Sequence, residues 1–200
     1  MITKFKTTST AVILLAISSL AGAEGNAEDG ATIGYSCLGC HGIEGYRNAY
    51  PSYRVPKLGG QKESYLVIAL QGYRDGTREH PTMNAQAESL SDEEIQITAA
   101  FLATLGTETV AAGGSSGTSF SPAQTCVACH GQNGISVSPG WPTLAGQHEE
   151  YLEHSLNQYR NGERKQTVMA QMAVGLSDAD VKLLARYYAR LEGLETTQPE

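Results

Sequence analysis

The sequence predicts an all-α protein composed of two tandem domains, each made of a few helices. The second half repeats the first, because PKLGGQ at residues 56–61 recurs as PTLAGQ at residues 142–147, an offset of 86. Leu-Ser-Asp recurs at the same offset, at residues 90–92 and 176–178. In both copies an acid follows the serine by three residues, which is typical of a helix N-terminus. Little of either half alternates apolar and polar residues as a strand does.

The helices follow in the same order in each half. A short helix is expected over residues 27–35, and its shorter counterpart begins at Ser121-Pro122, with serine at the cap and proline in the first turn. Apolar positions at helical spacing predict four more helices, over residues 62–73, 148–159, 91–105 and 177–191.

A segment rich in Gly, Ser and Thr, residues 106–119, separates the two repeats and has the composition of a linker. We therefore expect the first domain to span residues 24–105 and the second to span residues 120–200. Each domain has roughly 80 residues, near the lower limit of what one hydrophobic core stabilises unaided.

The first 23 residues have the pattern of a secretory signal peptide. Lys4 and Lys6 precede an apolar run over residues 11–20, and Ala21-Gly22-Ala23 resembles a cleavage site. The run is short for a bilayer core of about 30 Å. We expect export and cleavage after Ala23, and a retained membrane anchor is the alternative.

Cleavage leaves 12 basic and 21 acidic side chains, because the removed segment holds two lysines and no acid. An acidic chain without clustered Lys and Arg is a poor match for nucleic acid. No other apolar run is long enough to cross a membrane. We therefore expect a periplasmic protein with no nucleic-acid partner and at most peripheral membrane association.

Each half carries a Cys-x-x-Cys-His motif, at residues 37–41 and 126–130. This motif is the attachment signature of c-type haem. Two cysteines three positions apart on a helical turn can each bond the porphyrin, and the adjacent histidine then lies over the iron. We therefore expect two haem c groups, held covalently by four cysteines and ligated by two histidines: Cys37, Cys40, Cys126, Cys129, His41 and His130.

Three other roles are open to these cysteines, namely one zinc site, two disulfides or thiol redox chemistry. A single zinc site needs the two pairs to meet, whereas each pair here has its own histidine and its own repeat unit. A thiol redox motif needs a βαβ context, which is absent. The repeat therefore favours haem.

Methionine is the best candidate for the second axial ligand. At the offset of 86, Met83 matches Met169, whereas Met172 matches Gln86. Met169 and Met172 share one face of a helix, so their spacing alone does not separate ligation from packing. The matched positions favour Met83 for the first iron and Met169 for the second, with Met172 as a packing residue.

Three histidines lie outside the Cys-x-x-Cys-His motifs. His80 matches Gln166, so if His80 were an iron ligand, only the first domain would have a histidine ligand at this position. His148 and His154 have no histidine counterparts, and we expect both at the surface.

Two further repeated features lie near the expected haem sites. The backbone carbonyl of Pro56 or Pro142 can accept the second N–H of an axial histidine, or the proline can simply form a turn. Tyr73-Arg74 and its repeat Tyr159-Arg160 can bind haem propionates, join the two domains, or be ordinary exposed helix residues.

With these motifs, the chain resembles the dihaem cytochrome c4 family over essentially its whole mature length. The resemblance implies two class I cytochrome c domains, each with helices wrapped around one covalently attached haem, packed about a pseudo-twofold axis. It implies His/Met ligation of both irons, which favours electron transfer. It also implies a non-enzymatic respiratory carrier that takes electrons from a donor such as a bc1 complex or small copper protein and passes them toward a terminal oxidase.

Two alternative functions would use the same two haem groups. Similar dihaem chains form the cytochrome subunit of sulfide-oxidising flavocytochromes or related sulfur-compound dehydrogenases, which are enzymes as assemblies. A dihaem oxidoreductase acting directly on a small sulfur compound would need an unusual or open ligand position on one iron. The matched Met83 and Met169 argue against that reading.

Overall fold

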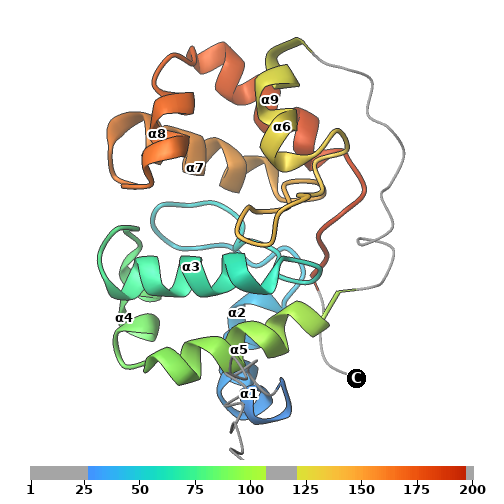
Figure 1. The fold of residues 1–200 in the computed structure, drawn as a ribbon. Helices are drawn as coiled ribbons and strands as arrows, with labels where there is room; N and C mark the ends of the chain where they lie inside the picture. The colour runs from blue at the N-terminus through green and yellow to red at the C-terminus, as the bar shows by residue number, and fades with distance from the viewer. Residues whose placement is uncertain (1–26, 107–120, 197–200) are drawn as a thin grey trace, which may run out of the picture.

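The computed structural model describes residues 27–106 and 121–196, which form two helical domains stacked on one another (Figure 1). Within these residues the only β-pairing is a pair of isolated bridges, so the all-α prediction is confirmed. The expected signal peptide, residues 1–23, and the expected linker after residue 106 lie outside the described residues. None of the described helices is long and apolar enough to span a membrane.

The first domain contains a 3-10 turn, η1 (Tyr35–Cys37), and five helices: α1 (Ala27–Gly34), α2 (Leu38–His41), α3 (Glu63–Arg74), α4 (Pro81–Glu88) and α5 (Asp92–Thr104). α5 packs against α1 and α3, and α4 packs against α3. The core is a cluster of apolar side chains: Leu38, Leu66, Val67, Leu70, Ile95, Ala99, Phe101 and Leu102. The crossing of α1 over α5 is so close that a Cβ on Gly30 would lie 1.8 Å from the carbonyl oxygen of Ile97.

The second domain contains a 3-10 turn, η3 (Ser121–Ala123), and four helices: α6 (Gln124–His130), α7 (Glu149–Asn161), α8 (Thr167–Ala173) and α9 (Asp178–Ala189). α7 packs against α8 and α9. Its smaller core cluster is Ala123, Leu152, Leu184, Ala185 and Tyr188. Within the described residues η3 occupies the place of α1, and it packs against α9 as α1 packs against α5.

Both expected capping boxes are present. The Ser91 hydroxyl accepts the backbone N–H of Glu94 at 3.2 Å, and the Glu94 carboxylate accepts the Ser91 N–H at 2.8 Å. Ser177 and Asp180 form the same arrangement at 3.1 and 3.0 Å. Each box satisfies backbone donors that a helix leaves unpaired at its start, which fixes where α5 and α9 begin.

The two domains meet through hydrogen bonds that repeat about an approximate twofold axis. The side-chain amide of Gln61 exchanges two bonds with the backbone of Thr143, and that of Gln147 exchanges two with the backbone of Lys57. Gln61 and Gln147 occupy matched repeat positions, as do Lys57 and Thr143. The two domains therefore contact each other through equivalent surface patches.

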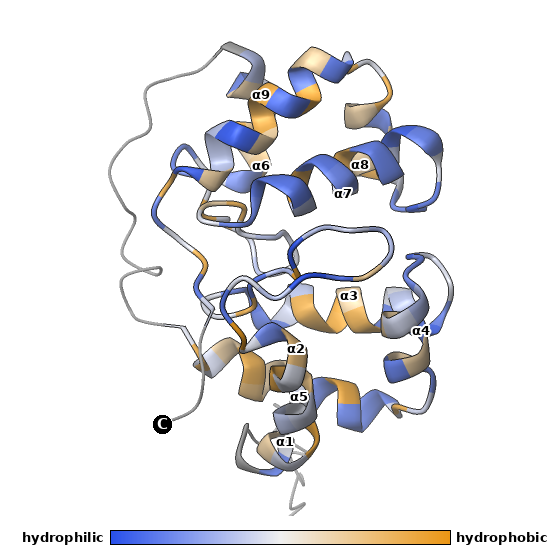
Figure 2. Ribbon diagram, turned by 180° about the vertical axis from the view of Figure 1, so that it is seen from behind, coloured by the Kyte–Doolittle hydropathy of each residue, from blue (hydrophilic) through white to orange (hydrophobic). Residues whose placement is uncertain are grey.

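Other contacts between the domains have no matched copy. Glu150, on the hydrophilic helix α7 (Figure 2), forms ion pairs with Arg47 and Arg54 of the first domain, both at 3.0 Å. The segment after α9 returns to the first domain (Figure 1), where Glu195 and Gly59 exchange backbone hydrogen bonds. These contacts add an asymmetric part to the interface.

Candidate functional site

A cavity of about 980 Å³, lined mostly by apolar side chains, extends through both domains. It receives side chains from the Cys-x-x-Cys-His segments, from the facing helices α3 and α7, and from the short helices α4 and α8. All eight side chains that the sequence predicts as haem attachments or ligands line it: Cys37, Cys40, His41, Met83, Cys126, Cys129, His130 and Met169.

No disulfide joins Cys37, Cys40, Cys126 and Cys129. Burial raises the pKa of the Cys37 and Cys126 thiols. The two cysteine pairs remain in separate domains, and the described residues contain no group of three or more His, Cys, Asp or Glu side chains placed to hold a metal ion. This arrangement gives the single zinc site and the disulfides no support.

Each motif histidine is held by a proline carbonyl. Nδ1 of His41 lies 2.7 Å from the Pro56 carbonyl oxygen, and Nδ1 of His130 lies 2.9 Å from that of Pro142. A carbonyl only accepts, so Nδ1 carries the proton and Nε2 presents its lone pair. Burial lowers the pKa of both imidazoles, which favours the neutral form that binds a metal. The proline carbonyls therefore orient the two histidines, as one of the two sequence interpretations held.

The two methionines lie in the first turn of short helices with matched caps. His80 precedes α4, and its Nδ1 accepts the Met83 backbone N–H at 3.3 Å. Gln166 precedes α8, and its side-chain oxygen accepts the Met169 N–H at 3.1 Å. The sequence did not predict α4. Both thioethers are partly buried, and Met83 packs against the first core cluster.

This set of donors fits haem c. Each domain offers two free thiols, one imidazole nitrogen and one thioether around a mostly apolar wall, which matches covalent attachment with His/Met ligation of iron. The cavity also contains buried polar atoms without a partner, among them Nε2 of His80 and Nε of Arg78 and Arg164. Such atoms are expected where a further group completes the site.

Comparison with known proteins agrees with this chemistry. The family model for cytochrome c matches the chain twice, over residues 27–106 and 115–191. Cytochrome c4 of Azotobacter vinelandii is 31% identical over 89% of this chain and 95% of its own length. The reduced recombinant cytochrome c4 of Pseudomonas stutzeri has a TM-score of 0.65 and 29% identity, over 84% of this chain and 100% of that structure. The chain belongs to the cytochrome c4 family.

It is therefore a dihaem electron carrier of the cytochrome c type, since its two cytochrome c domains imply covalently bound haem c. Two other similar proteins concern thiosulfate. The thiosulfate dehydrogenase electron acceptor of Stutzerimonas stutzeri strain A1501 is 34% identical over 82% of each chain. The thiosulfate dehydrogenase of Marichromatium purpuratum has a TM-score of 0.63 and 26% identity, over 82% of this chain and 40% of that structure.

Three side chains lie elsewhere in this cytochrome than the sequence suggests. His148 is buried at 6% exposure rather than at the surface, and burial lowers its pKa to about 4. His154 is half-buried and stacks on Tyr53 of the other domain, with ring centroids 4.5 Å apart. Met172 lines the cavity but is 49% exposed, so it contributes little to the protein core. Both histidines were mispredicted because they lie where the two domains meet.

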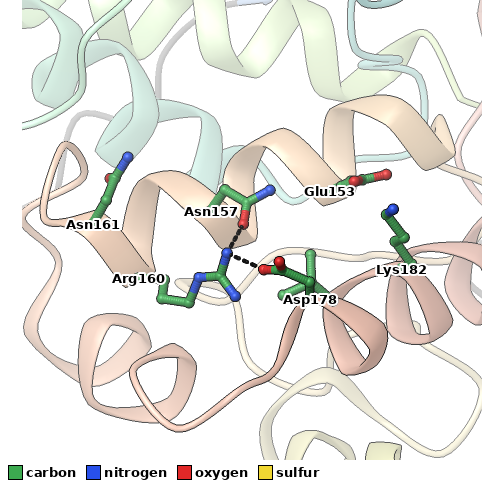
Figure 3. Close-up of a pocket in the computed structure, with 7 residues that line it drawn as sticks. Glu153, Asn157, Arg160, Asn161, Asp178 and Lys182 are labelled. Carbon is green, nitrogen blue, oxygen red and sulfur yellow. Dashed lines mark hydrogen bonds and ion pairs between the residues drawn. The ribbon is translucent and has the colours of Figure 1, made fainter.

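The arginines of the repeated Tyr-Arg pairs do not face the cavity. Figure 3 shows Arg160 directed at Asn157 of its own helix and at Asp178 of α9, with hydrogen bonds of 2.8 and 2.6 Å. Arg74 binds Asp92 at the start of α5 in the same way, at 2.8 Å. Arg74 thus ties α3 to α5, and Arg160 ties α7 to α9, which gives these two arginines an intradomain role. The tyrosines of both pairs, Tyr73 and Tyr159, line the cavity.

Two other arginines in the cavity were missed. Arg78 and Arg164 are 8% and 3% exposed, and both line the cavity. The repeat contained the signal, because Gly76-x-Arg78 recurs as Gly162-x-Arg164 at the same offset of 86. An arginine that occurs at the same position of both repeats could have been predicted to line the cavity on the same grounds as the matched methionines.

Proposed function

We propose that this chain binds two haem c groups, one in each domain, and carries electrons between redox proteins in the periplasm. The first haem is attached to Cys37 and Cys40 and ligated by His41 and Met83; the second is attached to Cys126 and Cys129 and ligated by His130 and Met169. The observation that carries the proposal is that both sets line one mostly apolar cavity while both histidines are oriented by proline carbonyls.

The proposal includes the organisation expected from the sequence. Residues 1–23 form the signal peptide, residues 24–105 the first domain, residues 106–119 the linker and residues 120–200 the second domain. Export supports covalent haem attachment outside the cytoplasm, and the acidic mature chain suits a basic protein partner.

The chain's own residues favour electron transfer over substrate chemistry. Haem supplies an iron that alternates between ferrous and ferric states. The Pro56 and Pro142 carbonyls hold the tautomer of the two motif histidines. With haem bound, these histidines together with Met83 and Met169 would hold the two irons, a ligand set that favours electron transfer over binding of a substrate. The apolar walls keep water away from the reacting centre. On this basis the chain is a carrier and not itself an enzyme.

The proposed direction of transfer is from a donor such as a bc1 complex or a small copper protein toward a terminal oxidase. A second candidate is the electron acceptor of a thiosulfate dehydrogenase, or of a related sulfur-compound dehydrogenase. The similarity to the acceptor of Stutzerimonas stutzeri, at 34% identity, and to the Marichromatium purpuratum enzyme favours this second candidate.

One experiment tests the carrier function and separates the two partners. The purified holoprotein is mixed with a thiosulfate dehydrogenase and thiosulfate, or, in its reduced form, with membranes that contain a terminal oxidase, and haem absorbance is followed over time. Rapid reduction in the first mixture supports the thiosulfate role, and rapid oxidation in the second supports the oxidase role. Turnover of thiosulfate or sulfide by the protein alone would overturn the carrier proposal.

A further inference from the structure

Asn84 directly follows Met83, and its partly buried side chain makes three hydrogen bonds. Its amide nitrogen donates to the backbone carbonyl of Tyr73 at 2.6 Å and to that of Arg78 at 3.0 Å. Its oxygen accepts the backbone N–H of His80, the residue that caps α4, at 2.7 Å. The nitrogen and the oxygen of this side chain are therefore both engaged.

These bonds join the start of α4 to the end of α3. Tyr73 lies in the last turn of α3, where backbone carbonyls have no partner within the helix. Asn84 satisfies one of these carbonyls and ties the segment between the two helices to the turn that carries Met83. Met83 also packs against the first core cluster. A movement of Met83 away from the cavity would therefore break several contacts together.

The second domain lacks this arrangement. At the offset of 86, Asn84 matches Ala170, whose methyl group neither donates nor accepts a hydrogen bond. The cap that accepts the N–H of Met169 comes from Gln166, which is exposed, whereas His80 is 9% exposed. The first turn of α8 is therefore held by fewer side-chain bonds than that of α4.

A contact across the domain interface adds to this difference. The side-chain amide of Gln158, on α7, donates to the carbonyl of Glu79, just before α4, at 3.2 Å. The repeat mate of Gln158 is Gly72, which has no side chain to bind the segment before α8 in return. The bond between the two segments themselves, from the Lys165 N–H to the Thr77 carbonyl at 2.9 Å, involves both of them. The start of α4 thus receives one support from the other domain that the start of α8 does not.

The readiness with which a methionine leaves its iron depends on the helix that carries it. A competing ligand binds only the fraction of molecules in which the methionine has moved away, so a smaller open fraction weakens its apparent affinity. We propose that Asn84 is a positioning residue that keeps Met83 on the first iron, so that the second iron exchanges Met169 for an added ligand more readily. This inference rests on the proposed function, since it takes both methionines to be iron ligands.

The test is a titration of the ferric holoprotein with imidazole at about pH 8, where most of the imidazole is neutral. The sulfur–iron absorption band and the NMR signals of each haem are followed, and Met83→Leu and Met169→Leu variants assign them to the two irons. The second haem should lose its methionine at an imidazole concentration about tenfold lower than the first, a difference that one or two hydrogen bonds supply. Equal midpoints, or earlier loss at the first haem, would overturn the inference.

Variants of Asn84 show whether its side chain causes the difference. Asn84→Ala should lower the midpoint of the first haem about tenfold and leave that of the second unchanged. Asn84→Asp keeps the shape but turns the donor amide into an acceptor that faces two carbonyls, so it should lower the first midpoint at least as far. Glu88→Gln, at the exposed end of α4, is the control and should match the parent.

The second haem of each variant is the internal reference for a general loss of stability. An unmoved first midpoint in Asn84→Ala, a parent-like midpoint in Asn84→Asp, or an equal shift at both haems would contradict the inference. Haem content and the sulfur–iron band are measured first on every sample. A parent protein without two methionine-ligated haems refutes the proposed function, whereas two such haems with equal midpoints refute only the role of Asn84.

Discussion

Gln61 and Thr143 exchange two hydrogen bonds across the domain interface, with the amide nitrogen of Gln61 3.0 Å from the Thr143 carbonyl and the Thr143 nitrogen 2.9 Å from the Gln61 side-chain oxygen. The same oxygen accepts the backbone N–H of Lys62, which precedes α3. Gln147 repeats the arrangement with Lys57 and with His148, which precedes α7. One side chain thus joins the domains and anchors a helix start.

Replacing Gln61 by Ala should therefore destabilise the protein. The change leaves the N–H and C=O of Thr143 buried without partners, which costs about 1–3 kcal/mol for each unpaired group. Gln147→Ala should have a similar effect on Lys57. The free energy of unfolding in urea measures the loss, and Gln132→Ala, at an exposed position, is the control. An unchanged unfolding midpoint in Gln61→Ala would contradict a stabilising role for this contact.

Local patterns predicted much of the fold and of the candidate site. The helices over residues 62–73 and 148–159 differ from α3 and α7 by one or two residues at each end, because apolar spacing and caps act over short distances. The convergence of Met83 and Met169 on the cavity followed from the repeat, since equivalent positions in two copies of one fold occupy equivalent places.

What the sequence did not reveal depends on long-range contacts. α4 has no apolar periodicity over residues 81–88, and its start is fixed by the His80 side chain and by a proline in its first turn. Arg78 and Arg164 are of a residue type that is rarely buried, and only the meeting of the two domains encloses them. His148 was mispredicted for the same reason.

Loss of a helix cap should be measurable in the second domain. Ser177→Ala removes the hydroxyl that accepts the Asp180 N–H, and caps of this kind contribute about 1 kcal/mol. Thermal unfolding should show a lower midpoint for Ser177→Ala than for Ser177→Gly, because glycine at this position costs only a few tenths of a kcal/mol. If the two variants unfold alike, the cap is not a source of stability.

The ion pairs of Glu150 should make stability depend on pH in an acidic range. Burial raises the pKa of Glu150, but hydrogen bonds from Arg47 and Arg54 outweigh it and lower the pKa to about 2. A carboxyl with a lowered folded-state pKa contributes stability above its unfolded pKa, about 4.3, and that contribution is lost as the pH falls toward 2. Both partners are more than a third exposed, so the contribution is at most about 1 kcal/mol.

The comparison of the parent with Glu150→Gln isolates this effect. The variant should be less stable at pH 6, and the two unfolding free energies should converge as the pH falls from about 4.5 to about 2. The control is Glu153→Gln, because Glu153 lies one turn further along α7 and forms no ion pair among the described residues. Its free energy of unfolding should equal that of the parent at every pH. A constant difference between Glu150→Gln and the parent across this range would mean that the carboxylate charge is not responsible.

The choice between Met169 and Met172 is the sharpest test of the proposed site. Met169 is partly buried, has Gln166 as its cap and matches Met83, whereas Met172 is half-exposed and matches Gln86. Met169→Leu should therefore abolish the sulfur–iron band of the second haem in the ferric protein, while Met172→Leu should retain it. The opposite result would assign the ligand to Met172. A band that disappears only in the double variant would show that Met172, one helical turn away, replaces Met169 when it is lost.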